Sequence, residues 1–309
     1  MNRSRAHHSR LTICLFFVAF APIAACHGSS SDTSDAATSL AQPHPSVTAV
    51  PSTPMNAAAL PSASVAAMVN PTNLPPYTGP TGSLEGTISV KGDPAPAANL
   101  DLSRCPQTAS IYGKTFREGA TLADGSRQLA DALVVVTGYH GGFIPERQPS
   151  KTLEIHDCAY ATRTVDLTYG QKLLIANKDA KTVYAPVLDA FPTMAVMVPA
   201  PNADPITLYP EKPGFSTLSD RMGSPLTADV YVLLQPLHTV SDTSGHYRID
   251  GIPVGKVDLN VRLRTINHDV TKPVEVHDGV VDHVDVVLDY KTPIARPEVD
   301  AGPRKPNIR

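Results

Sequence analysis

Residues 240–261 read Val-Ser-Asp-Thr-Ser-Gly-His-Tyr-Arg-Ile-Asp-Gly-Ile-Pro-Val-Gly-Lys-Val-Asp-Leu-Asn-Val, and this stretch decides the fold. The side chain of Asp242 can cap a turn, and Gly245 can supply the positive φ that the turn requires. Tyr247 and Ile249 are two positions apart, so their side chains share one face of a strand. The Ile-Pro-Val-Gly segment at 252–255 predicts a second tight turn, and alternating apolar residues follow it. The stretch therefore predicts two β-strands joined by tight turns.

Short apolar runs of the same kind recur along the chain. They are rich in β-branched residues and are separated by turn-forming residues, which is typical of strands and turns. The runs expected as strands are 84–90, 130–137, 153–155, 162–167, 172–176, 195–198, 229–234, 242–247, 256–264, 274–277 and 280–288. No convincing apolar stripe with the period of a helix occurs, although 185–194 could hold a short helical turn. These spacings predict an all-β chain, either a sandwich or a partly open barrel.

The 240–261 stretch resembles the repeating signature of carboxypeptidase regulatory-like domains. These are small sandwiches related in shape to transthyretin. The resemblance implies an antiparallel β-sandwich, and we expect it over 82–290, with 236–290 as the regulatory-like strands. It implies no activity, because function must be argued from a site and not from a fold.

A second stretch, 153–179, is similar to the core of cupredoxin-like secreted proteins. It contains Ile155-His-Asp-Cys158, then a Gly170-Gln171 turn, a strand, and Asn177-Lys-Asp179. In that family a strand bearing cysteine, a Gly-Gln turn and Asn-x-Asp follow in the same order. The order of the flanking strands also fits, so the resemblance implies a cupredoxin-like part over about 82–235.

The copper ligands of the cupredoxin-like family are missing from the matching positions. Blue copper needs two histidines and a cysteine, with a weak axial methionine. Val183 holds the place of the first histidine, and Asp220, Gly223 and Leu226 hold those of the cysteine, second histidine and methionine. Met222 is near, but a lone thioether holds no copper. We therefore expect no cofactor and no metal at these positions.

The amino terminus resembles the signal peptide of bacterial lipoproteins. A basic flank precedes an apolar run at 11–21, which is too short to span a bilayer. Ile23-Ala-Ala-Cys26 is similar to the lipobox, which implies that Cys26 becomes the first mature residue and carries the lipid as a palmitate-type anchor. Because His27 replaces the Asp of inner-membrane lipoproteins, the resemblance implies sorting to the outer membrane in a Gram-negative host. The alternative is an ordinary secretory peptide cut near Ala25, which leaves Cys26 as a free thiol.

Two further cysteines remain after cleavage, Cys105 and Cys158. If Cys26 carries lipid, these two can pair, and secretion into an oxidising compartment favours a disulfide. The alternatives are two separate buried thiols or a catalytic pair. Their spacing is unlike Cys-x-x-Cys, which argues against the catalytic pair.

Composition changes at both ends of the predicted sandwich. Residues 1–25 are expected as the signal peptide, and 26–81 as a disordered tether rich in Pro, Ala and Ser. Residues 291–309 are Pro-rich and polar, and we expect a disordered tail. The tether would raise the sandwich above the lipid surface.

Three other groups of residues were considered as sites. His140-Gly-Gly-Phe143 is similar to the oxyanion loop of esterases, but the nucleophile turn of such enzymes is absent. The His and Asp residues between 268 and 285 could approach one another and bind a cation, or could form a solvated sheet edge. Five tyrosines could line a sugar- or peptide-binding surface, or serve as ordinary strand residues. They are Tyr160, Tyr169, Tyr184, Tyr209 and Tyr231.

The net charge of −3 and the 18% of charged residues argue against a nucleic-acid partner. No catalytic motif is apparent, so we expect no enzyme. The sequence favours a lipoprotein of the cell envelope, facing the periplasm or the cell surface, whose sandwich binds an envelope protein or a glycan or has a structural role. The alternatives are a copper-binding or electron-transfer cupredoxin-like protein and a glycan-binding accessory module.

Overall fold

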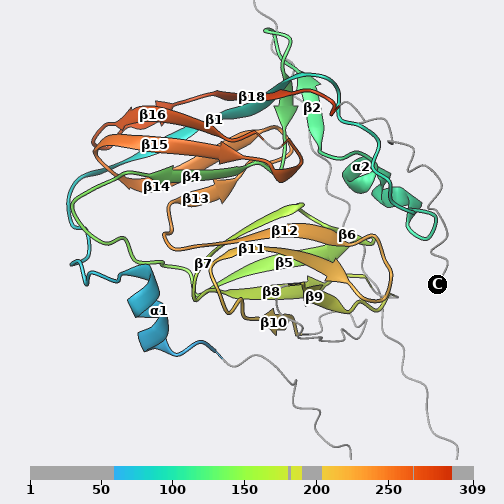
Figure 1. Ribbon diagram of the computed structural model, residues 1–309, viewed down its shortest axis with the longest axis horizontal. Helices are drawn as coiled ribbons and strands as arrows, with labels where there is room; N and C mark the ends of the chain where they lie inside the picture. The colour runs from blue at the N-terminus through green and yellow to red at the C-terminus, as the bar shows by residue number, and fades with distance from the viewer. Residues whose placement is uncertain (1–58, 180–181, 190–203, 267, 294–309) are drawn as a thin grey trace, which may run out of the picture. The chain divides into compact units, whose positions relative to one another are not determined.

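The computed structural model describes residues 59–179, 182–189, 204–266 and 268–293. Its strands form four sheets, which enclose two separate apolar cores (Figure 1). The predicted all-β fold with antiparallel β-sandwich architecture is confirmed. Within the described ranges, none of the helices has the length and hydropathy needed to cross a bilayer.

The first sandwich is built from strands at both ends of the described chain. One sheet has the order β14-β1-β3-β2, with β17 and β18 beside β1, and the other has the order β13-β4-β15-β16. The strands are β1 (Thr81–Gly92), β2 (Glu118–Thr121), β3 (Arg127–Leu129), β4 (Leu133–Thr137), β13 (His238–Val240), β14 (His246–Pro253), β15 (Gly255–Arg262), β16 (Val270–Val276), β17 (Val281–His283) and β18 (Val286–Tyr290). Leu84 and Ile88 of β1 and Leu259 of β15 are fully buried in the core between these sheets.

The second sandwich is built from the strands between β4 and β13. Its sheets have the orders β10-β8-β5-β6 and β7-β12-β11-β9. The strands are β5 (Ser150–His156), β6 (Ala159–Tyr160), β7 (Thr164–Thr168), β8 (Lys172–Asn177), β9 (Pro186–Leu188), β10 (Ile206–Leu208), β11 (Gly214–Asp220) and β12 (Thr227–Leu233). Ile155, Leu173 and Leu218 are fully buried in its core.

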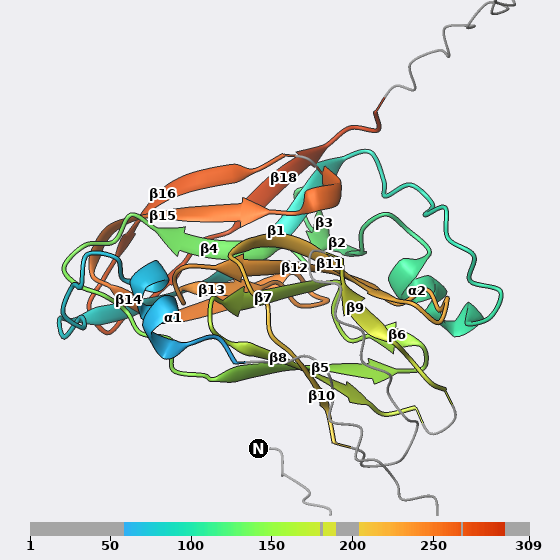
Figure 2. The same cartoon turned by 60° about the horizontal axis from the view of Figure 1, so that its bottom comes forward.

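The pairing of the strands does not follow the boundary that was expected between two parts of the sandwich at residue 235. β1 pairs antiparallel with β14 and parallel with β18, so strands about 160 to 200 positions apart in sequence lie side by side (Figure 1 and Figure 2). Residues 81–137 therefore belong with 238–290, and 150–233 form a sandwich inserted between them. The physical reason is burial, because the apolar face of β1 is covered by the regulatory-like strands and not by the cupredoxin-like ones.

The turn predicted from Asp242 and Gly245 is present. Asp242 Oδ1 accepts hydrogen bonds from the Ser244 amide and hydroxyl and from the His246 amide. Gly245 has a φ of 78°, and a Cβ at this position would lie 2.3 Å from the carbonyl oxygen of Ile88. Glycine is therefore required both by the backbone conformation and by the close approach of β1.

The last part of the expected tether is folded. The helix α1 (Ser62–Val69) lies within 59–81, and Leu60, Val65 and Val69 pack against the core of the second sandwich. A little further on, the Tyr77 amide donates to the Phe143 carbonyl over 2.8 Å. The prediction of disorder is thus wrong for 59–81, because a few apolar residues spaced along one helical face suffice to dock a short helix on an existing core.

Several other expectations concern particular segments. At 186–188 the structure has the strand β9 where a helical turn was considered. Of the expected tail, Thr292 is ordered by a hydrogen bond from its amide to Asp93 Oδ2. The signal peptide 1–25, Cys26, the tether up to residue 58, the strand 195–198 and residues 294–309 lie outside the described residues.

Candidate functional site

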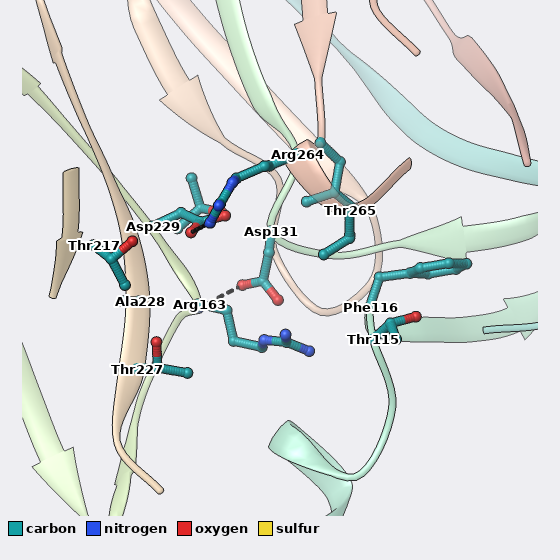
Figure 3. Close-up of a pocket in the computed structure, with 12 residues that line it drawn as sticks. Thr115, Phe116, Asp131, Arg163, Thr217, Thr227, Ala228, Asp229, Arg264 and Thr265 are labelled. Carbon is teal, nitrogen blue, oxygen red and sulfur yellow. Dashed lines mark hydrogen bonds and ion pairs between the residues drawn. The ribbon is translucent and has the colours of Figure 1, made fainter. Parts of the chain in front are cut away.

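Residues of both sandwiches line a small cleft, drawn in Figure 3 and called the polar cleft for its charged and hydroxyl-bearing side chains. Its cavity measures about 160 Å³, and a wider hollow of about 370 Å³ shares Leu263 and Arg264 with it. The first sandwich contributes Asp131 and Arg264, and the second contributes Arg163 and Asp229. Arg264 begins the short helix η2 (Arg264–Ile266), and Asp229 lies on β12.

Asp131 anchors the inner end of the cleft. It is only 2% exposed. Its carboxylate accepts two hydrogen bonds from the Arg117 guanidinium at 2.5 and 2.6 Å. It also accepts the Thr162 hydroxyl and the Arg163 amide, each at 2.9 Å. One buried carboxylate thereby connects the bend between β3 and β4 with the segment that leads into β7, and hence the two sandwiches.

Arg163 fills the floor of the cleft. Its Nη1 donates to the Lys114 carbonyl over 2.8 Å, and its guanidinium carbon lies 5.9 Å from the centre of the Tyr112 ring. Burial lowers the pKa of this guanidinium, and the nearby Asp131 opposes that shift. Because arginine stays protonated even so, the floor of the cleft is cationic.

Arg264 lies at the mouth of the cleft and is more than half exposed. Its Nη1 donates to Asp229 Oδ1 over 3.2 Å, and its guanidinium carbon lies 4.5 Å from the centre of the Phe215 ring. Burial raises the pKa of the Asp229 carboxyl, although the Arg264 charge opposes the rise. Behind Phe215, burial followed by the charge of Asp229 raises the pKa of Tyr231 to about 12.

The remaining lining of the cleft is rich in hydroxyl groups. Thr115, Thr164, Thr217, Thr227 and Thr265 all line it. The hydroxyl of Thr115 is buried and has no hydrogen-bond partner within the described part of the chain. Unsatisfied buried hydroxyls are uncommon in native proteins. The cleft can therefore bind a small polar group by hydrogen bonds and by its two guanidinium groups.

The predicted Cys105–Cys158 pair is confirmed. The sulfur atoms lie at disulfide distance, and the Cα atoms are 6.1 Å apart. This bond ties the loop before the short helix α2 (Ala109–Tyr112) to the turn between β5 and β6. Asp179 supports the same turn, because its carboxylate accepts the amides of Asp157 and Cys158.

The four positions compared with copper ligands serve other purposes. Asp220 accepts the Ala185 amide on one oxygen and the Ser224 amide and hydroxyl on the other. Leu226 belongs to the core of the second sandwich. Gly223 has a φ of 77°, and Val183 is partly buried. In the described residues, no group of three or more His, Cys, Asp or Glu side chains could hold a metal ion.

Several of the His and Asp residues of 268–285 are paired with other groups instead of converging on one point. His277 Nδ1 lies 3.0 Å from Asp282 Oδ1, and His283 Nε2 lies 3.1 Å from Glu85 Oε1. Asp285 accepts the amide of Thr87. Each of these groups is already hydrogen-bonded within the protein. Structural contacts therefore explain the presence of these side chains at the sheet edge.

The other sequence candidates are also explained by packing. Four of the five tyrosines are buried, and only Tyr209 is partly exposed, so they form no common surface. In the loop at His140–Phe143, the backbone of Phe143 pairs with the segment around Pro76. Sequence reasoning missed the polar cleft itself. Its one signal was the presence of Asp131 and Asp229 inside runs expected as buried strands.

Comparisons with known proteins give structural likenesses alone. No protein-family profile matches the chain, and no curated protein matches it. Among solved structures, a reduced-state amicyanin mutant is similar over 26% of this chain and 79% of its own, with 14% identity and a TM-score of 0.22. The likeness is weak and concerns the fold alone.

Proposed function

We propose that this protein is a lipid-anchored protein of the cell envelope whose two sandwiches act together as a non-catalytic binding module. Its anchor is Cys26, and the tether between the anchor and α1 holds the module away from the lipid surface. The partner is an envelope protein, which contributes an acidic segment to the polar cleft.

The observation that carries this proposal is the position of Arg264. Its guanidinium stacks on Phe215 and makes one long hydrogen bond to Asp229, yet most of its side chain remains exposed. Phe215 is itself 41% exposed. An arginine held flat on an aromatic ring keeps donors free for a second carboxylate, and such pairs are favoured at protein interfaces. The adjacent hollow adds Arg262, which is about half exposed and is paired with Asp269. An acidic segment with an apolar neighbour fits this arrangement.

Replacing Arg264 with alanine is expected to weaken binding of acidic peptides at least tenfold, because the free guanidinium donors and the cover on Phe215 are both lost. The measurement is binding of the mature protein to an array of acidic peptides that contain an aromatic residue. Arg248→Ala is the matched control, since Arg248 is 43% exposed against 56% for Arg264 and pairs with Glu85 and Asp250 away from the cleft. Equal binding of peptides with their Asp residues changed to Asn would contradict the proposal.

Replacing Cys26 with alanine is expected to abolish incorporation of labelled palmitate and to release the protein from the membrane fraction. The reason is that several acyl chains on one residue are needed for stable anchoring. The measurement is metabolic labelling of the full chain in a bacterial host. Cys14→Ala serves as the control, because Cys14 lies inside the predicted signal peptide and should leave the label unchanged. Label that persists in Cys26→Ala would show that the anchor is wrong.

A further inference from the structure

A second cavity, of about 410 Å³, lies where α1 and the loop before β5 meet the second sandwich. Its size falls in the range of small-molecule sites. Most of its wall is apolar, and the main contributors are Leu60, Val65, Val69, Ile144 and Leu234. Leu234 is 42% exposed, so this apolar lining remains open to solvent on one side. It shares no residue with the polar cleft.

One end of this cavity is polar and consists of Glu146 and Thr168. The Thr168 hydroxyl donates to Glu146 Oε2 over 2.6 Å, and the Gln148 amide donates to Glu146 Oε1 over 2.8 Å. Both donors are neutral. Among the described residues, no cationic side chain makes an ion pair with Glu146. A carboxylate has about four acceptor sites, so Glu146 retains capacity for another donor.

A chain of hydrogen-bonded polar groups holds the Thr168 side chain in place. Its hydroxyl oxygen lies 3.0 Å from His238 Nε2, and His238 Nδ1 lies 2.7 Å from Asp166 Oδ2. Lys151 pairs with the other oxygen of Asp166. Burial alone would raise the pKa of Asp166, but the hydrogen bond from His238 and the charge of Lys151 lower it well below its usual value. Asp166 is therefore neutralised locally, whereas Glu146, at the cavity end of the chain, is not paired directly with a cation.

We infer that this cavity is a binding site for a small amphipathic amine. The aliphatic body of the ligand lies among the apolar side chains of α1 and Ile144, and its ammonium group donates to Glu146. Charge complementarity selects the head group, since Glu146 is the only Asp, Glu, Lys, Arg or His among the described residues that line this cavity. The preorganised Thr168 hydroxyl keeps that carboxylate oriented toward the cavity.

The test uses n-octylamine, n-octanol and octanoate as probes, titrated calorimetrically into the mature protein. We expect octylamine to bind at least tenfold more tightly than octanol, and octanoate to bind more weakly than either. Glu146→Gln should reduce the affinity for octylamine to that for octanol, because the amide keeps its shape but loses its charge. The matched control is Glu154→Gln on β5, an exposed glutamate that pairs with His156 and Lys178 and should change nothing.

A second variant tests whether the probes bind in this cavity, independently of the charge of Glu146. Ala66 is exposed on α1 and lines the cavity, so Ala66→Phe fills the space without disturbing a buried side chain. We expect it to weaken all three probes at least tenfold while leaving the thermal midpoint of the free protein unchanged. Equal binding of octylamine and octanol by the wild-type protein would overturn the inference. An unchanged affinity for octylamine in either Glu146→Gln or Ala66→Phe would also overturn it.

Discussion

Replacing Asp131 with asparagine is expected to lower the free energy of unfolding by about 3 kcal/mol, measured by urea denaturation. Asparagine tolerates the left-handed backbone at this position, where φ is 65°, so the change isolates the charge. The side chain of Arg117 is only 13% exposed and would lose its carboxylate partner. Removing one member of a buried ion pair leaves an uncompensated charge, and this cost dominates the expected effect.

The control for Asp131 is an equally close ion pair at the surface. Asp269 accepts hydrogen bonds from both Nε and Nη2 of Arg262, but both side chains are about half exposed. Asp269→Asn should therefore cost less than about 1 kcal/mol, because water and salt screen exposed pairs. Similar losses for the two variants would mean that Asp131 does not connect the sandwiches in the way its contacts indicate.

Replacing both Cys105 and Cys158 with alanine is expected to lower the free energy of unfolding by about 4 kcal/mol. The bond joins residues separated by 53 positions, and closing a loop of this length removes that much chain entropy from the unfolded state. The measurement is again urea denaturation, with the wild-type protein under reducing conditions as a second sample that should match the double variant.

Cys26→Ala is the control for this second prediction, since it removes a cysteine and keeps the pair. It should leave the midpoint of unfolding unchanged and should still respond to reductant. A wild-type protein whose stability does not change on reduction would contradict the role assigned to the disulfide. Loss of stability in Cys26→Ala would instead show that Cys26 takes part in cysteine pairing.

Much of the fold could be predicted because its signals are local. Asp242 and Gly245 form the expected turn, and Val257, Leu259 and Val261 of β15 are buried on one face as their alternation predicts. The sequence did not predict the strands β2, β3, β6, β9, β10, β11 and β13. All except the seven-residue β11 are only two to four residues long, and so short a run carries too little periodicity to be distinguished from a loop.

The candidate site could not be predicted in the same way. Asp131, Arg163 and Arg264 are separated by about 30 and 100 positions, and nothing in their neighbouring residues relates them. The same holds for the second cavity, where Glu146 and Thr168 meet only because the loop before β5 returns to the end of β7. A charged residue within a run expected as a strand, as at Asp131, Asp166 and Asp229, was the sole local indication.

The all-β class, the turn at 242–245 and the availability of Cys105 and Cys158 for pairing could be inferred from the amino acids alone, since each depends on residues whose chemistry acts locally or by elimination. The pairing of 81–137 with 238–290 in one sandwich and the docking of α1 on the other became evident in the folded chain. Which strand covers an apolar face depends on burial summed over the whole chain, and many pairings of short strands satisfy the same alternation. The polar cleft and the second cavity follow from that choice, because both are lined by residues that this pairing brings together.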